Sequence, residues 1–281
     1  MALSIRPLTE PDLDTADALL QSAFGGPVSR LPDLRLYRDA EPSGLWMAER
    51  DGQRVGMVGA VNYATVAHLG FMVVRQSAQR QGIGMALMQH ILSTLQGQRV
   101  PVATLDASPA GYPMYLKLGF VDYDSTCLFH CERPPRGRCP PEVRPIAAVD
   151  LAALAAWDSE VFGADRGRVL RALLNAFPAR AFVLRDEAGR ILGHVCAQAS
   201  RIGPWVAGNP ADAETLLRAA LSVAYAGPVS LTVPGLNPAA AELLLRYGFD
   251  MVRANRHMGK GASEPPSCRC HIYGQTSQFF G

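Results

Sequence analysis

Two glycines stand one residue apart in the segment QRQGIGMALMQHIL, residues 79–92, directly before an apolar pattern of helical period. A loop that enters a helix exposes unpaired backbone N–H groups at the positive end of the helix dipole, where phosphate is a common ligand. Gly82 and Gly84 have no Cβ atoms, so a ligand can approach the backbone closely. The segment therefore predicts an anion-binding loop.

Two well-known phosphate-binding loops do not match this segment. The dinucleotide fingerprint G-x-G-x-x-G needs a third glycine at the position of Leu87. The P-loop of nucleoside triphosphatases needs a Gly-Lys-Ser/Thr sequence, and none follows Gly84. We therefore expect an anion site of another kind.

The surrounding pattern predicts the elements that position this loop. A strand that ends at Val74 and a helix that begins at Gly82 place the loop at a strand–helix junction. In the first half of the chain we expect helices over residues 9–25, with Thr9 as N-cap and Gly25 at the end, 82–97 and 110–119, and strands over 4–8, 45–50, 54–65, 67–74 and 100–107. Residues 120–131 are interpreted as a pair of strands, and residues 25–44 as a loop that lines the pocket. The result is an α/β fold around a mixed sheet.

The two halves of the chain repeat the same landmarks in the same order. Glycine, proline and phenylalanine dominate the matches, so chance similarity between alanine-rich helices is a poor explanation. Arg6, Pro7, Asp12, Leu13, Phe24 and Gly25 match Arg144, Pro145, Asp150, Leu151, Phe162 and Gly163; Gly52, Gly56 and Ala60 match Gly189, Gly193 and Ala197; Pro109, Leu116, Gly119 and Phe120 match Pro238, Leu245, Gly248 and Phe249. The repeat predicts domains over residues 1–131 and 142–281, joined by a proline-rich linker over 132–141.

Two motifs together resemble the GCN5-related N-acetyltransferases, the GNAT family. Gln79-x-x-Gly82-x-Gly84 resembles the family's pyrophosphate loop, Q/R-x-x-G-x-G/A, and MYLKLGF, residues 114–120, is similar to its L-Y-x-K-L-G-F segment. The distance between the motifs leaves room for a helix, a strand and a helix. The resemblance covers about residues 3–131. It implies an α/β (α+β) fold of two tandem GNAT-like domains, each a mixed, mostly antiparallel sheet flanked by helices.

The resemblance also implies acetyl-CoA as cosubstrate and a set of residues that contact it. The cofactor would lie between the strand segments 69–74 and 102–107, and Tyr115 would protonate the leaving thiolate. A phenol with an ordinary pKa of about 10 stays protonated at neutral pH. The expected cofactor-binding residues are Met72, Val73, Val74, Gln79, Arg80, Gln81, Gly82, Ile83, Gly84, Met85 and Ser108, where Ser108 replaces an Asn that many members carry.

The sequence does not identify the general base. Many family members place a Glu on the fourth strand, and residues 67–74 contain none. His68 and Asp106 are the nearest titratable candidates, and a chain of water molecules would also serve. A histidine at the surface where a strand starts, and an acid that ends the fifth strand, are the structural interpretations of these two residues.

The second copy has lost both chemical features while it keeps the structural landmarks. Asp212 and Glu214 fall near the positions of the two glycines, where carboxylates would repel a pyrophosphate. Leu244 falls at the position of Tyr115. We expect this copy not to bind acetyl-CoA in the usual way, as in tandem members related to mycothiol synthase. Its final segment, residues 268–281, is expected to pack as a strand, on the second copy or across the seam between the copies. The competing interpretation is a disordered tail, because residues 259–267 before it are typical of a flexible segment.

Composition excludes several other function classes. The net charge of the 281 residues is only +2, which gives no reason to expect nucleic acid or a membrane surface as partner. We find no secretory signal and no apolar run long enough to span a membrane, so we expect a cytoplasmic protein. We also expect a bacterial source. None of the six cysteines forms a CxxC pair, and the spacing of Cys268, Cys270 and His271 fits no common zinc site, so no metal is expected.

The leading hypothesis is therefore an acetyl-CoA-dependent N-acetyltransferase that acts on a primary amine of a small molecule. The alternative is a non-catalytic acyl-CoA-binding or regulatory protein on the same fold, which the missing Glu favours and Tyr115 opposes. The acceptor is open between polyamine, antibiotic, amino acid and protein terminus. The oligomeric state is open between monomer and homodimer.

Overall fold

The structure is a computed structural model that describes residues 3–24 and 28–281, and the side chain of Phe24 is not described. The chain forms two compact units. One contains Met1–Leu105 together with Phe280, and the other contains Asp106–Phe279 together with Gly281. The expected terminal glycine, Gly25, lies outside the described residues. The domain limits 1–131, 132–141 and 142–281 follow the sequence repeat and stay a prediction.

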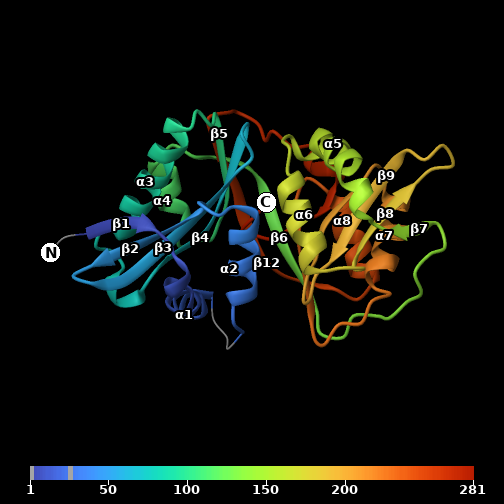
Figure 1. Cartoon of the computed structure of the whole chain (residues 1–281), viewed down its shortest axis with the longest axis horizontal. Coiled ribbons are helices and arrows are strands. Elements are labelled where there is room, and N and C mark those ends of the chain that lie inside the picture. The colour runs from blue at the N-terminus through green and yellow to red at the C-terminus, as the bar shows by residue number, and fades with distance from the viewer. Residues whose placement is uncertain (1–2, 25–27) are drawn as a thin grey trace. The chain divides into compact units, whose positions relative to one another are not determined.

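The first unit is built on one mixed sheet. Its strands run in the order β1-β2-β3-β4-β5, with antiparallel neighbours except for the parallel pair β4 and β5. Helices α1 and α3 cover opposite faces of strands β2 to β4 (Figure 1). The elements are β1 (Leu3–Pro7), η1 (Glu10–Asp12), α1 (Leu13–Phe24), α2 (Leu31–Ala40), β2 (Leu45–Arg50), β3 (Gln53–Asn62), β4 (Val66–Val74), η2 (Gln76–Ala78), α3 (Ile83–Gly97) and β5 (Val102–Ala107).

Helix α2 corrects the expectation of a pocket-lining loop over residues 25–44. The helix begins next to Pro32, and proline is favoured in a first helical turn. Its Leu34 and Tyr37 are fully buried, because they face the sheet. The Tyr37 ring meets Phe71 edge to face, with ring centroids 5.0 Å apart, and lies 5.1 Å from Phe280. The apolar face of α2 is therefore part of the core of this unit.

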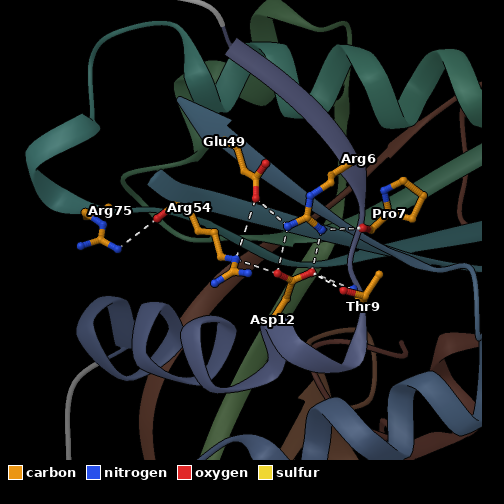
Figure 2. Close-up of polar contacts among 7 residues, drawn as sticks. All are labelled: Arg6, Pro7, Thr9, Asp12, Glu49, Arg54 and Arg75. Carbon is orange, nitrogen blue, oxygen red and sulfur yellow. Dashed lines mark hydrogen bonds and ion pairs between the residues drawn. The ribbon is translucent and has the colours of Figure 1, made fainter. Parts of the chain in front are cut away.

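An ion-pair cluster holds the corner between β1 and α1 (Figure 2). The carboxylate of Asp12 is fully buried and accepts hydrogen bonds from Arg6 at 2.7 and 2.9 Å and from the backbone N–H of Thr9 at 2.8 Å. Arg54 from β3 lies 2.6 Å away, and Glu49 from β2 binds the other side of Arg6. The bonds from Arg6 hold the pKa of Asp12 well below its ordinary value.

The corresponding corner of the second copy uses the same acid. Asp150, the counterpart of Asp12, accepts the backbone N–H of Ala147 at 2.9 Å and a hydrogen bond from Arg185 at 3.0 Å. In both copies the acid closes the turn that leads from the first strand to the first helix. The repeated aspartate therefore has the same structural role in both copies.

The second unit contains α4, β6 and the second copy except Phe280. Its strands form the antiparallel group β12-β6-β11 and the antiparallel group β13-β10-β9-β8-β7. The elements are α4 (Tyr112–Lys117), β6 (Val121–Cys131), β7 (Val143–Pro145), η3 (Ala148–Asp150), α5 (Leu151–Phe162), α6 (Gly167–Ala176), β8 (Ala181–Arg185), β9 (Ile191–Ala197), β10 (Ile202–Ala207), α7 (Pro210–Ala220), β11 (Val229–Pro234), α8 (Pro238–Arg246), β12 (Asp250–Lys260), η4 (Arg269–His271) and β13 (Ile272–Gly274). The mixed, mostly antiparallel sheets with flanking helices confirm the predicted fold class.

Strand β6 corrects the expectation of two short strands over residues 120–131. It is one strand of 11 residues that lies between β12 and β11. Its register pairs Cys131 with Val229 on one side and His130 with Asp250 on the other. The last strand of the first copy thus takes both of its neighbours from the second copy.

The C-terminal segment is packed, but only Ile272–Gly274 of the predicted residues 268–281 form a strand. Strand β13 pairs antiparallel with β10, and its Tyr273 lies 5.2 Å from Trp205 between ring centroids. Phe279 and Phe280 are also buried. The carbonyl of Phe280 accepts a hydrogen bond from the Tyr63 hydroxyl at 2.7 Å. The competing interpretation, a disordered tail, is therefore wrong.

A second buried polar network connects the C-terminal segment to the rest of the second copy through Thr276. Arg166 donates to both carboxylate oxygens of Asp158 at 2.6 and 2.8 Å, and its remaining nitrogen donates to Thr276 at 3.1 Å. His194 lies 2.6 Å from the same carboxylate. All three ionisable side chains are at most 1% exposed. Burial alone would raise the pKa of Asp158, but Arg166 and His194 hold it below its ordinary value.

Candidate active site

The loop before α3 presents open backbone, as the glycine pattern predicted. Gly82 is the N-cap residue, with a left-handed φ of 80°, and no side chain caps the helix. A Cβ at Gly82 would meet no atom within 4 Å, so the space next to the backbone is open. The first helical hydrogen bond runs from the N–H of Ala86 to the carbonyl of Gly82. The N–H groups of Ile83, Gly84 and Met85 precede this bond, and the geometry of a helix gives them no partner within it.

Side chains of the same loop hold its entry in place. Gln79 donates to the carbonyl of Val74 at 3.0 Å, and Gln81 donates to the carbonyl of Ser77 at 3.1 Å. Arg50 binds the side chain of Gln81. Arg80 has a φ of 59°, an uncommon conformation for a residue with a side chain that is often found at functional loops. The loop that carries the predicted contacts is therefore shaped by its own glutamines.

Strand β4 bends next to this loop. Phe71 has a φ of 51°, and the register of β4 on β3 shifts at this point. On the other side, the pairing of β4 with β5 runs from Val66 and Val102 to Leu69 and Leu105. Residues 72–74 continue beyond that pairing, and Val73 and Val74 still pair with β3. The edge of β4 opposite β3 can accept an extended ligand there, as expected for Met72, Val73 and Val74.

Tyr115 lies in α4 of the second unit, and its ring packs over Gly111. A Cβ at Gly111 would stand 2.9 Å from Cε2 of that ring, so only glycine leaves the ring in this place. The ring of Phe120 meets Tyr115 edge to face at 6.0 Å. Burial raises the pKa of Tyr115 to about 12, because the phenolate would lose its hydration. The hydroxyl therefore stays protonated throughout the neutral range.

Ser108 forms the turn that leads to this helix. Its carbonyl accepts the backbone N–H groups of Gly111 at 3.0 Å and Tyr112 at 2.9 Å, and its hydroxyl accepts the N–H of Gly111 at 3.3 Å. The side chain is exposed. Ser108 thus shapes the turn before α4, and its contact with the cofactor stays a prediction.

The two candidate bases have different environments. His68 is buried, at 2% exposed, and its Nδ1 lies 3.1 Å from the hydroxyl of Thr104, which corrects the expectation of a surface histidine. Asp106 at the end of β5 has a side chain that is 1% exposed. Its Oδ1 accepts a hydrogen bond from Thr126 at 2.8 Å and lies 2.8 Å from Nδ1 of His257. The sequence alone gave no signal for His257, because this residue belongs to the other copy.

The second copy closes the helix end that corresponds to α3. Asn209 caps α7 by accepting the N–H of Asp212 at 3.0 Å, and Pro210 occupies the first turn. Glu214 binds Arg246 and Tyr247, both at 3.0 Å. Leu244 is fully buried in α8, so it is a core residue. These contacts are consistent with a copy that does not bind a pyrophosphate at this helix.

Within residues 3–24 and 28–281, no group of three or more His, Cys, Asp or Glu side chains is arranged to hold a metal ion. The six cysteines are free thiols. In the same described ranges, no helix is both long and apolar enough to cross a membrane.

Comparison with family models finds the same family in both halves of the chain. Residues 27–130 and residues 154–274 each match a model described as an acetyltransferase (GNAT) domain. The two matches lie on the two copies of the repeat.

Similar proteins include acetyltransferases from several organisms. A Pyrococcus horikoshii protein of known structure, assigned as an acetyltransferase, is 27% identical, with a TM-score of 0.86 over 99% of this chain and 96% of that chain. The uncharacterized N-acetyltransferase YitH of Bacillus subtilis is 22% identical over 70% of this chain and 71% of that protein. The mycothiol acetyltransferase of Streptomyces coelicolor is 32% identical over 33% of this chain and 31% of that protein. With both copies matched, this chain belongs to the GNAT family of acetyltransferases and carries two GNAT domains in tandem.

Proposed function

We propose that this protein is an N-acetyltransferase that moves an acetyl group from acetyl-CoA to a primary amine of a small molecule. The observation that carries the proposal is the open N-terminus of α3, where Gly82 leaves the backbone N–H groups accessible. The corresponding helix of the second copy is closed by Asn209. The first copy is therefore the one that binds the cosubstrate.

Acetyl-CoA supplies an activated acyl group and a good leaving group, the thiolate. The N–H groups at the start of α3 hold its pyrophosphate at the positive end of the helix dipole. The backbone of Met72, Val73 and Val74 pairs with the pantetheine arm, and one N–H there polarises the thioester carbonyl. Tyr115 donates a proton to the sulfur as it leaves, and its raised pKa keeps that proton in place beforehand.

The proposal is tested by product analysis with a panel of amines. The protein is incubated with acetyl-CoA and spermidine, glucosamine, kanamycin, free lysine or a short peptide, and each product is measured by mass spectrometry. A thiol-reactive dye is unsuitable because Cys139, Cys268 and Cys270 are exposed. We expect at least one amine to gain an acetyl group in a protein-dependent reaction.

The alternative function gives a different result in the same experiment. A non-catalytic acyl-CoA-binding protein would bind acetyl-CoA in calorimetry and acetylate none of the amines. A protein that neither binds acetyl-CoA nor transfers its acetyl group would contradict both hypotheses.

A further inference from the structure

Strand β13 lies in a slot between β10 and β11, within the second unit. It pairs antiparallel with β10 on one side. On the other side, the N–H of Gln275, directly after β13, donates to the carbonyl of Thr232 in β11 at 2.8 Å. Where β10 begins, Arg201 and Ser230 form a direct parallel bridge. The two strands are therefore neighbours at one end of the slot, and β13 separates them at the other.

Strand β10 holds the same place in the second copy as β4 holds in the first. The sequence repeat matches Gly56 of β3 with Gly193 of β9. Gly56 pairs with Val74, the last residue of β4, and Gly193 pairs with Ala207, the last residue of β10. Val74 and Ala207 therefore correspond, and along these two strands the copies are 133 positions apart.

The residues that β13 covers are the counterparts of the expected pantetheine contacts. At this offset, residues 205–206 of β10 correspond to residues 72–73 of β4. The register places Gly274 opposite Trp205 and Ile272 opposite Val206. The edge of β10 that could pair with a pantetheine arm is thus already paired with the chain's own backbone.

Asn237 provides a second point of correspondence. Its side-chain amide donates to the carbonyl of Ile272 at 3.0 Å, and its side-chain oxygen accepts the N–H of Ala240 at 3.1 Å, which caps α8. Asn237 lies 129 positions after Ser108, the offset that relates this part of the two copies. Ser108 is the position where the family resemblance implies an Asn that contacts the cofactor. In the second copy this Asn is present, and it binds β13.

Further contacts show that the slot fits a peptide backbone closely. Gln198 donates to the carbonyl of Gly203 at 2.5 Å and to the carbonyl of Thr276 at 2.9 Å. A Cβ at Gly203 would stand 2.0 Å from the carbonyl oxygen of Gln275, so only glycine lets the segment approach this near. The Tyr273 side chain between these contacts is 2% exposed. Backbone atoms thus make most of the polar contacts, as in recognition by strand addition.

We propose that the second copy is a peptide-binding domain whose slot takes an extended peptide strand, and that the chain's own C-terminal segment is its resident ligand. The first copy uses the corresponding slot for the acyl-CoA arm, and this comparison rests on the proposed function. The second copy has exchanged that cofactor for a peptide. Because the segment is tethered beside its slot, its effective concentration is high, and it excludes a free peptide of the same sequence.

The test separates the segment from the chain while it stays in its slot. A site for a sequence-specific protease is inserted between Ser263 and Glu264, which are both exposed, and the folded full chain is cut there. A peptide of residues 264–281 with a fluorophore at its N-terminus is then added under reducing conditions, and its anisotropy is measured. We expect the labelled peptide to exchange into the cut chain and not to bind the uncut chain.

A peptide with Gln275→Pro is the matched control. Proline has no N–H, so this peptide loses the donor to Thr232. We expect it to bind the cut chain about tenfold or more weakly, the effect of about one hydrogen bond.

Hydrogen exchange in the uncut chain gives a second measurement, which also serves if the cut chain does not stay folded. Asn237→Asp keeps an oxygen that can cap α8 but has no donor for the carbonyl of Ile272. We expect the amides of residues 272–277 to exchange about tenfold or more faster, for the loss of about one hydrogen bond. Asn209→Asp is the control, because Asn209 caps α7 through Asp212, and it should leave exchange at residues 272–277 unchanged.

Each outcome supports or overturns the inference. A cut chain that keeps its segment through gel filtration supports it, whereas one that loses the segment and binds no labelled peptide overturns it. Equal binding to cut and uncut chains, equal affinities of the two peptides, or wild-type exchange in Asn237→Asp would also overturn it. None of these measurements uses acetyl-CoA or an amine. A protein that acetylates no amine would therefore overturn the proposed function and leave the peptide slot standing.

Discussion

Asn209 accepts a hydrogen bond from the backbone N–H of Asp212 at 3.0 Å, and this bond closes the N-terminus of α7. The equivalent helix of the first copy, α3, starts at Gly82 with no side-chain cap. In a capped helix, a backbone N–H group that could bind an anion already donates to the capping side chain. In an uncapped helix, this N–H group has no such partner. Under the proposed function, this difference is the reason to expect the cosubstrate at the first copy.

The first prediction concerns Gly82. Both Gly82 and Gly189 have a φ near 80°, and a Cβ at either position meets no atom within 4 Å. Alanine at either position should cost about 1–2 kcal/mol of folding free energy, because a side chain disfavours the left-handed conformation. Only Gly82→Ala should also weaken acetyl-CoA binding, by about tenfold or more in calorimetry, since its methyl group would project into the phosphate site. Equal acetyl-CoA affinities for the two variants would show that the loop does not bind the pyrophosphate.

The second prediction concerns the hydroxyl of Tyr115. Tyr115→Phe keeps the ring and its contact with Phe120, so acetyl-CoA affinity should change little. Turnover should fall by about a hundredfold or more, because the proton donor is lost. Tyr225→Phe is the matched control, because Tyr225 is another tyrosine whose pKa is raised by burial. Wild-type turnover of Tyr115→Phe would identify Tyr115 as a core residue only.

The third prediction concerns Gly111, which lies under the ring of Tyr115. The Cβ of Gly111→Ala would stand 2.9 Å from Cε2 of that ring and must displace it. We expect kcat to fall by about tenfold or more, since a misplaced catalytic group loses its orientation. In the Tyr115→Phe background the same change should cost less, because the two residues act as one unit. Fully additive effects on kcat would mean that Gly111 does not act through Tyr115.

The fourth prediction concerns the buried pair of Asp158 and Arg166. Asp158→Asn or Arg166→Met alone leaves the other charge buried without its partner, and should lower the free energy of unfolding by about 3–5 kcal/mol. The double variant Asp158→Leu with Arg166→Met should lose less than either single variant, because no charge stays unpaired. Urea unfolding measures all three. A double variant that loses the sum of the single effects would contradict this account.

The fifth prediction concerns acid. Arg6 holds the pKa of Asp12 below its ordinary value, so the unfolded state binds a proton at a higher pH than the folded state does. The stability that Asp12 contributes is fully present above about pH 4 and is lost as pH falls through the lowered pKa of the folded state. Asp12→Asn should be less stable than wild type at pH 7 and should lose less stability between pH 4 and pH 2. Parallel pH profiles in chemical unfolding would rule out this role for Asp12.

Local patterns predicted the parts of the fold and site that depend on neighbouring residues. Gly82 takes a left-handed conformation directly before α3. The glycine itself and the apolar helical pattern that follows it are both visible in the local sequence. The repeated aspartates close local turns, so their spacing was visible in each half. The position of Tyr115 in α4 follows from a short motif for the same reason.

Features that depend on distant residues were not predictable in this way. Strand β6 was interpreted as two strands because the polar run Asp122–Thr126 interrupts its apolar pattern, and its partners β11 and β12 lie in the other copy. Helix α2 was not predicted, because what fixes it is the burial of Leu34 and Tyr37 against distant parts of the unit. His257 was missed because its relation to Asp106 exists only after β12 has paired with β6.

The pairing of β6 with strands of the second copy has a consequence for synthesis of the protein. Cys131 pairs with Val229, so the last strand of the first copy leaves the ribosome roughly a hundred residues before its first partner. At a translation rate of about 5–20 residues per second, this strand waits roughly 5–20 s without a neighbour. Both of its edges can bind other chains during that time. A chain whose synthesis stops within the second copy would therefore expose both edges of this strand to other chains.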